Sequence, residues 1–174
     1  MSMSARPDSD LVRAAQAGDV ASFELLYMKY APVVHAIVLG RLPAADADDV
    51  TQNVFITAYT KLASLRETAA FAGWIARIAR NAAEDQRRRA GDWTQIDTDY
   101  AARATQADAA EAAHALAAIR GLPEAYRETL MLRLVEGMSA AEIGERTGLT
   151  PGSVRVNLHR GMQLLREALG EGDA

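Results

Sequence analysis

One window near the C-terminus, residues 139–160, constrains the fold of this chain more than any other part of the sequence. Ser139 and Glu142 match a capping box, in which two side chains satisfy backbone amides at the start of a helix. Gly148 permits the positive φ of a tight turn, and Thr150, followed by a proline, fits the cap of a second helix. The window therefore predicts two helices joined by a tight turn, which is a helix-turn-helix motif.

Apolar residues in this window indicate how the two helices pack. Gly144 allows them to approach closely, and the expected buried seam consists of Ile143, Leu149, Val154 and Leu158. The second helix then turns its other side to solvent, where its residues are candidates for contacts in the major groove of DNA. These candidates are Thr150, Ser153, Arg155, Val156, Asn157, His159 and Arg160.

Charge gives a mixed signal for nucleic-acid binding. The net charge of −4 argues against it, because such domains usually carry an excess of basic residues. Residues 147–166, however, contain arginines and a histidine but no acidic residue. Arg155 and Arg160 could be no more than a solvated helix face, but their position directly behind two helix caps and a turn favours contact with DNA.

Apolar residues recur at helical spacing over most of the chain, and no run alternates apolar with polar residues as a strand would. The predicted helices lie at 8–17, at 19–30 with the same period continuing over 33–42, at 46–62, 71–89, 113–119, 123–136, 140–147 and 151–169. Residues 63–70 show no such period. The sequence therefore predicts an all-α fold.

Residues 91–112 divide these helices into two groups. The stretch loses the apolar period and carries several acidic residues against the single basic Arg103, which is typical of a solvated linker. We therefore expect two small helical domains, at 8–90 and 113–170, joined by a flexible acidic linker at 91–112. Such a linker would leave the two domains unaligned in the free protein.

Several classes of protein are disfavoured by what the sequence lacks. Cysteine is absent and the three histidines are scattered, so we expect no disulfide, metal site or cofactor. No histidine lies near a paired acid and no phosphate-binding glycine loop occurs, so we do not expect an enzyme. The polar N-terminus and the lack of a long apolar run predict a cytoplasmic protein that does not insert into membranes.

Three segments carry a resemblance to a known family. Residues 122–133, which start with Leu-Pro and lead into Gly-Met-Ser-Ala-Ala-Glu-Ile, closely resemble region four of the extracytoplasmic-function (ECF) sigma factors. Residues 46–55 and 71–81 resemble the acidic helix of region two and the helix that follows it. The resemblance covers nearly the whole chain, in order and at normal spacing.

This resemblance implies a sigma factor that binds core RNA polymerase and directs it to promoter DNA, with an anti-sigma factor as a further partner. It gives an interface role on the polymerase to Asp46, Asp48, Asp49, Gln52, Asn53 and Ile56. It assigns the minus-ten promoter element to Arg66, Arg77, Arg80, Asn81, Arg87 and Arg88. It assigns binding of the minus-thirty-five element to the outward-facing residues of the second helix of the helix-turn-helix.

Alternatives remain at three places. The three aspartates could simply compensate the dipole at a helix start, and both roles can hold together. Phe71 and Trp74 could stack on bases, but beside Ile75 and Ile78 they are better explained as core. For the whole chain, the main rival is a stand-alone helix-turn-helix regulator, which would bind duplex DNA specifically without polymerase.

Overall fold

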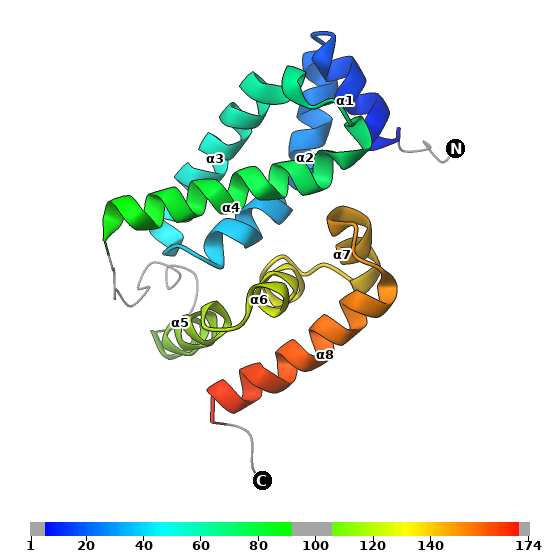
Figure 1. The fold of residues 1–174 in the computed structure, drawn as a ribbon. Helices are drawn as coiled ribbons and strands as arrows, with labels where there is room; N and C mark the ends of the chain where they lie inside the picture. Colours follow the sequence, from blue (N-terminus) through cyan, green and yellow to red (C-terminus); the bar gives the residue numbers. More distant parts are fainter. Residues whose placement is uncertain (1–5, 92–105, 171–174) are drawn as a thin grey trace.

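In the computed structural model, residues 6–91 and 106–170 are described, with the backbone alone for 106–109, and both ranges are helical without any strand. The predicted fold class is therefore confirmed. Figure 1 shows two helical units, one formed by the N-terminal range and one by the C-terminal range. The predicted linker lies largely outside the described residues.

The N-terminal unit consists of α1 (Asp8–Gln16), α2 (Val20–Leu39), α3 (Ala44–Lys61), two short 3-10 turns, η1 (Leu62–Ser64) and η2 (Thr68–Ala70), and α4 (Phe71–Ala90). Gly18, at φ 97°, ends α1 as predicted. The helix expected from Asp46 begins at Ala44, because Pro43 takes the cap position with the extended backbone that proline favours.

Pro32 does not interrupt α2, so the segments expected on either side of it form one helix. A proline inside a helix costs a backbone hydrogen bond. Around it, Val33, Val34 and Leu39 are almost fully buried, and this apolar burial keeps the helix continuous. The helix ends three residues before the expected end at 42, with Arg41 and Leu42 still bonded to the carbonyl of Val38.

Aromatic residues join the helices of the N-terminal unit. Phe71 at the start of α4 is fully buried and meets the buried Tyr30 of α2 edge to face, with ring centroids 5.2 Å apart. Trp74 is half-buried and lies against Phe71 at 5.8 Å. The core role expected for Phe71 is confirmed, and Trp74 packs at the edge of the same core.

The C-terminal unit consists of α5 (Gln106–Arg120), α6 (Glu124–Leu130), a π-helical turn η4 (Met131–Val135), α7 (Ala140–Thr147) and α8 (Pro151–Ala168). α5 begins inside the segment expected as linker, since its alanines favour a helix without an apolar stripe. α6 and α8 pack closely at Gly161, where a Cβ atom would lie 3.1 Å from the side chain of the buried Leu130.

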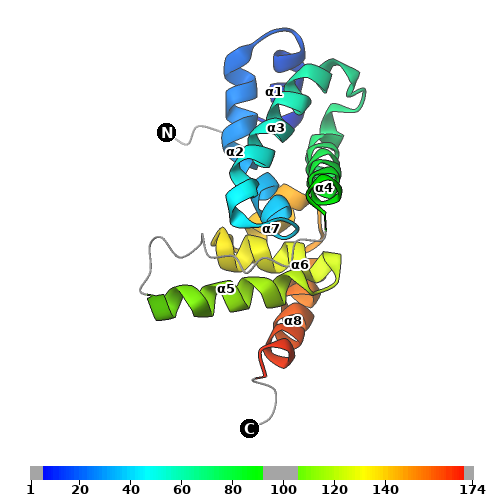
Figure 2. The ribbon, with the colours of Figure 1, turned by 90° about the vertical axis from the view of Figure 1, so that its left-hand side faces the viewer.

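The two units contact each other directly (Figures 1 and 2). α2 packs against η4, and α4 lies beside α7. The guanidinium group of Arg120 in α5 donates hydrogen bonds to the carbonyls of Leu39 and Leu42, at 2.9 and 2.7 Å, and so caps the end of α2 from the other unit. The expectation that the two units stay unaligned is wrong for this structure.

Candidate nucleic-acid and polymerase interfaces

The first helix of the predicted helix-turn-helix is capped as expected. The hydroxyl oxygen of Ser139 accepts from the amide of Glu142 at 3.2 Å, and the carboxylate of Glu142 accepts from the amide of Ser139 at 2.8 Å. The hydrogen bonds from Ser139 hold the pKa of Glu142 below its usual range. The capping box therefore starts α7 where it was predicted.

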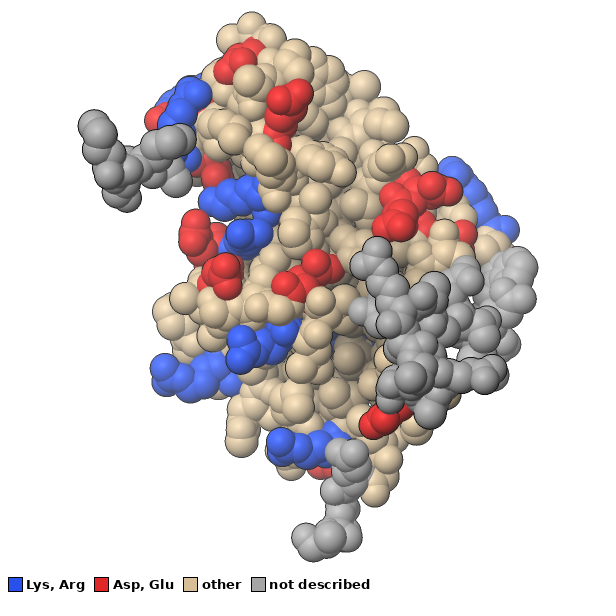
Figure 3. Space-filling model, turned by 180° about the vertical axis from the view of Figure 1, so that it is seen from behind, with Lys and Arg blue, Asp and Glu red and all other residues tan. Residues whose placement is uncertain are grey.

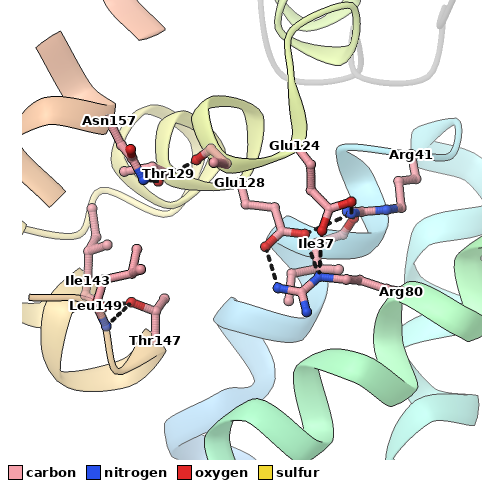
Figure 4. A network of polar contacts seen from close by, with 11 residues as sticks. Ile37, Arg41, Arg80, Glu124, Glu128, Thr129, Ile143, Thr147, Leu149 and Asn157 are labelled. Atoms are coloured by element: carbon pink, nitrogen blue, oxygen red, sulfur yellow. Dashed lines mark hydrogen bonds and ion pairs between the residues drawn. The ribbon is translucent and has the colours of Figure 1, made fainter. Parts of the chain in front are cut away.

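The turn that follows is also built as predicted. Gly148 has a left-handed backbone with φ 74°, and the hydroxyl oxygen of Thr150 accepts from the amide of Ser153 at 3.1 Å. A Cβ atom on Gly144 would lie 3.1 Å from the carbonyl oxygen of Leu149, so a side chain there would push the turn away. Thr147, which sequence reasoning missed, braces the turn by accepting from the amide of Leu149 at 3.3 Å (Figure 4).

Most candidates on α8 are exposed. Thr150 and Ser153 are exposed at its start, and a shallow hollow on its outer side is lined by Arg155, Val156, His159 and Arg160. Seen from behind, Lys and Arg side chains project from the lower half of the molecule at the edge where α7 and α8 lie (Figure 3). α8 thus presents a basic side to solvent.

Asn157 is the exception, and its expected outward position is wrong. Its side chain is half-buried, and the amide nitrogen donates to the hydroxyl of Thr129 in α6 at 3.3 Å (Figure 4). Asn157 lies between the buried Val154 and Gly161 in helical spacing, so it belongs to the side of α8 that faces α6.

The candidate polymerase interface lies along one side of α3. Five of its residues are exposed and one, Asp46, is half-buried in the first turn. The exposed ones are Asp48, Asp49, Gln52, Asn53 and Ile56. The apolar Ile56, 61% exposed, continues into Tyr59, which meets Phe23 of α2 edge to face at 4.9 Å. The face therefore runs from an acidic end to an apolar, aromatic end.

The candidate minus-ten residues divide into two groups. Five are exposed, on α4 and in the segment before η2: Arg66, Arg77, Asn81, Arg87 and Arg88. Within that group, Arg87 pairs with Glu84 and Arg88 with Asp85, one turn back on the same helix. Arg80 instead is half-buried and turned towards the C-terminal unit.

Arg80 is held there by carboxylates of α6 (Figure 4). Two nitrogens of its guanidinium group donate to the two oxygens of Glu128, at 2.9 and 2.8 Å, and Glu124 lies 3.3 Å away. Arg41, at the end of α2, donates to Glu128 at 2.8 Å and lies 3.2 Å from Glu124. These four residues, Arg41, Arg80, Glu124 and Glu128, form a cluster between the units that we call the clasp.

The clasp has strong electrostatic coupling. Burial by itself would raise the pKa of Glu128, but the hydrogen bonds and charges of Arg80 and Arg41 outweigh it and hold that pKa below its usual range. The hydrogen bond to Glu128 raises the pKa of Arg80. Sequence reasoning missed the clasp, and the only signal for it was the spacing of two glutamates, four apart, at the start of a predicted helix.

Beside the clasp, a cavity of about 470 Å³ lies between the two units. Apolar and polar side chains line it from both sides, among them Val33, Ile37, Arg80, Glu128, Leu132, Arg146, Leu149 and Asn157. The boundary between the units is therefore not filled like the interior of a single domain.

The described ranges contain neither a metal-binding cluster nor a membrane-spanning helix. Over residues 6–91 and 106–170, no group of three or more His, Asp or Glu side chains is placed to hold a metal ion. No helix in those ranges is both long and apolar enough to span a bilayer. The surfaces on α3, α4 and α8 thus remain as candidate sites.

Comparison with known proteins places both halves of the chain in one family. The family profile described as Sigma-70 region 2 matches residues 26–92, and the profile described as Sigma-70, region 4 matches residues 115–165. The RNA polymerase sigma factor CarQ of Myxococcus xanthus is 34% identical over 161 residues, covering 86% of this chain and 90% of that protein. The ECF RNA polymerase sigma-E factor of Escherichia coli (strain K12) is 31% identical over 182 residues, covering 91% of this chain and 92% of that protein.

Two solved structures share the fold. CnrH, in complex with the cytosolic domain of CnrY, has a TM-score of 0.60 at 23% identity over 96% of this chain and 99% of that chain. The sigma factor RpoE from Bartonella quintana, in complex with the anti-sigma factor NepR, has a TM-score of 0.57 at 18% identity over 88% of this chain and 100% of that chain. From its two matched regions and its relatives, we conclude that this chain belongs to the sigma-70 family, in the group of ECF sigma factors.

Proposed function

We propose that this protein is a sigma factor that binds core RNA polymerase and directs it to promoters to initiate transcription. The observation that carries the proposal is the exposed basic side of α8, which stands behind a fully capped helix-turn-helix. The relatives named as sigma factors support it over the length of the chain. In this role the protein itself catalyses no reaction, and it works in the cytoplasm with the polymerase.

In our proposal α8 reads the minus-thirty-five element as duplex DNA. Arg155 and Arg160 can hydrogen-bond to guanine edges or pair with phosphates, and Val156 can contact a thymine methyl group. Thr150 and Ser153 lie at the helix start, where amides and hydroxyls favour a phosphate oxygen. His159 lies on the same side, and Asn157 supports the helix through its bond to Thr129.

The polymerase interface is proposed to be the side of α3 that runs from Asp48 to Ile56. Exposed carboxylates guide the approach of a basic partner, and an exposed apolar side chain contributes contact area once the partner is bound. Gln52 and Asn53 lie between these ends and can donate and accept hydrogen bonds. Asp46 contributes mainly to the helix start.

The minus-ten element is proposed to bind along α4 as a single strand. Arg77, Arg87 and Arg88 are exposed for its phosphates, and Asn81 can hydrogen-bond to a base edge. Arg66 extends this surface towards η2. Arg80 joins it only when the clasp opens.

We further propose domains at 8–90 and 113–170, each with its own DNA element, and a connection through 91–112. The related CnrH and RpoE were solved in complexes with CnrY and with the anti-sigma factor NepR, respectively. By analogy, an anti-sigma factor is proposed as a partner of this chain.

Run-off transcription with purified core polymerase tests the proposal. The expected result is promoter-directed RNA only when the protein and the core enzyme are both present. A gel shift with the same promoter distinguishes a sigma factor from a stand-alone helix-turn-helix regulator, because the regulator would bind tightly and specifically without polymerase. Tight specific binding by the protein alone, with no stimulated transcription, would contradict the sigma-factor proposal.

A further inference from the structure

The clasp joins two surfaces that the proposed function needs to separate. Arg80 is a candidate ligand of the minus-ten strand, and Glu128 belongs to the unit that reads the minus-thirty-five element. Their contact is a two-pronged pair in which both carboxylate oxygens face guanidinium nitrogens. Such a pair is stronger than an ordinary surface ion pair because its geometry is fixed and its hydrogen bonds are charge-assisted.

Burial adds to the strength of the clasp. The side chain of Glu128 is 15% exposed and that of Arg41 10%, so either charge would be poorly solvated without its partner as long as the units stay together. Glu124 is more exposed, at 56%, and completes the ring from the outside. The four side chains of the clasp therefore depend on one another, and Glu128 contacts both arginines.

The rest of the boundary combines apolar packing of α2 against η4 with polar contacts. Lys29 lies 3.2 Å from Glu145, and its carbonyl accepts from Arg146 at 2.8 Å. His35 meets Glu136 at 2.6 Å. Polar contacts exchange readily with water, and the cavity of about 470 Å³ reduces the apolar contact area that would hold the units together.

A phosphate group can take the place of the glutamate. Carboxylates and phosphates both offer two oxygens at the spacing that a guanidinium fork accepts. Glu128 therefore occupies the position on Arg80 that a DNA phosphate would otherwise take. A phosphate that binds Nε and Nη2 of Arg80 must displace Glu128, although the Arg80 side chain is 38% exposed.

We infer that the clasp is an autoinhibitory contact: Glu128, assisted by Glu124, holds the free protein closed and competes with the phosphates of single-stranded promoter DNA for Arg80. This inference rests on the proposed function, because it assigns the strand to α4. Opening the clasp frees Arg80 and releases the C-terminal unit to take the separation that a promoter requires.

Two dyes on introduced cysteines report the opening, since the chain has no cysteine of its own. Ala17→Cys and Gln163→Cys place them at exposed positions, one in each unit, at the end of α1 and in α8. Relative to the parent, Glu128→Gln should move energy transfer towards the separated state, and Glu124→Gln should do so to a smaller extent. Glu111→Gln, on the exposed side of α5, removes the same charge away from the boundary and should leave transfer unchanged.

Binding of a fluorescent single-stranded oligonucleotide of promoter sequence tests the competition in the free protein. Glu128→Gln should tighten binding about fivefold, and the gain should disappear when Arg80→Ala is added. In the Glu128→Gln background, Arg77→Ala is the matched arginine one turn away and should leave part of the gain. Circular dichroism checks that each variant is folded.

The outcomes separate this inference from the proposed function. Unchanged energy transfer in both glutamate variants, or opening without tighter binding to the strand, would overturn the clasp as an inhibitor. If the parent protein and core polymerase together give no promoter-directed run-off transcript, the proposed function is overturned, whatever energy transfer between the dyes shows. Opening together with an Arg80-dependent gain in strand binding supports the inference.

Discussion

The arginines of α4 and those of α8 serve the same proposed purpose but are presented differently. Three arginines of α4, Arg80, Arg87 and Arg88, are paired with carboxylates. Arg77 of the same helix and Arg155 and Arg160 of α8 make no ion pair within the described residues. The difference follows from where acids occur. α4 carries its own acids one turn away and meets two more from α6, while α8 has no acid before its last turn.

This contrast shows that local sequence alone does not determine whether a basic helix is available to DNA. On α8 the free arginines can be read from the sequence around them. On α4 the state of Arg80 depends on a glutamate 48 residues away in the chain. The surface proposed for the minus-thirty-five element is thus exposed in this structure, and Arg80 of the surface proposed for the minus-ten element is partly covered.

The largest effect is expected from disrupting the close contact between α7 and the turn that precedes α8. Gly144→Val places a Cβ atom 3.1 Å from the carbonyl of Leu149, with two further methyl groups, and should destabilise the C-terminal unit by about 2–3 kcal/mol. Thermal unfolding by circular dichroism measures it. Promoter-directed transcription should fall as the C-terminal unit loses stability, while binding of single-stranded DNA along α4 should persist.

Gly152→Val is the matched control for this change. A Cβ atom there has its nearest neighbour, the hydroxyl of Thr150, at 3.9 Å, which is an ordinary van der Waals contact. Its stability should stay within about 0.5 kcal/mol of the parent. Equal losses in both variants would show that the close approach at Gly144 does not matter.

The next effect tests whether the free arginines of α8 act on DNA. Arg160→Ala should weaken binding of the minus-thirty-five duplex by the holoenzyme by about 1–2 kcal/mol. If the contact is to phosphate, the dependence of binding on salt should become shallower as well. Fluorescence anisotropy at several salt concentrations measures both.

Arg166→Ala, in the last turn of the same helix, is the control. It removes the same charge outside the proposed contact and should leave the affinity nearly unchanged. Equal affinity of the Arg160 variant and the parent at every salt concentration would mean that Arg160 is only a solvated side chain.

A smaller effect is expected on α3, whose surface should act independently of both basic helices. Asp49→Lys reverses an exposed charge on the proposed polymerase face and should weaken assembly with core enzyme by about 1 kcal/mol. Assembly is measured by co-elution and by titration of a labelled protein. Glu111→Lys makes the same reversal on α5 and should assemble normally, so similar losses in both would point to net charge instead of this face.

Sequence reasoning succeeded where the determinants were local. The capping box of Ser139, the glycine at 148 and the cap at Thr150 each depend on residues within a few positions, and all three are present. It failed where distant segments meet. The inward position of Asn157 depends on Thr129, and the capture of Arg80 depends on how α6 docks on the other unit. Neither contact leaves a periodic pattern in the sequence.

The smallest effect is a change with pH that should alter access to α4 and leave α8 as it is. The hydrogen bond to Glu136 raises the pKa of His35 against the effect of burial, and the charge of Asp48 from α3 adds to it. A group whose pKa is raised in the closed state stabilises that state fully below its ordinary pKa, about 6.5, and loses the contribution as the pH rises through the raised value.

The closed state should therefore weaken as the pH rises from about 6.5 through the raised pKa of His35. Glu128 has the opposite sign: its pKa is lowered in the clasp, so its contribution is complete at neutral pH and begins to be lost as the pH falls below its ordinary pKa of 4.5. Energy transfer between the dyes at positions 17 and 163, recorded from pH 5 to pH 9, should decline on the alkaline side. The decline should correspond to a loss of less than about 1 kcal/mol in the stability of the closed state relative to the open state. His35→Gln should remove that decline, because glutamine keeps a hydrogen bond to Glu136 without titrating. A decline that survives in His35→Gln would show that another group controls the boundary, and the contrast between the covered α4 and the free α8 would then rest on the clasp alone.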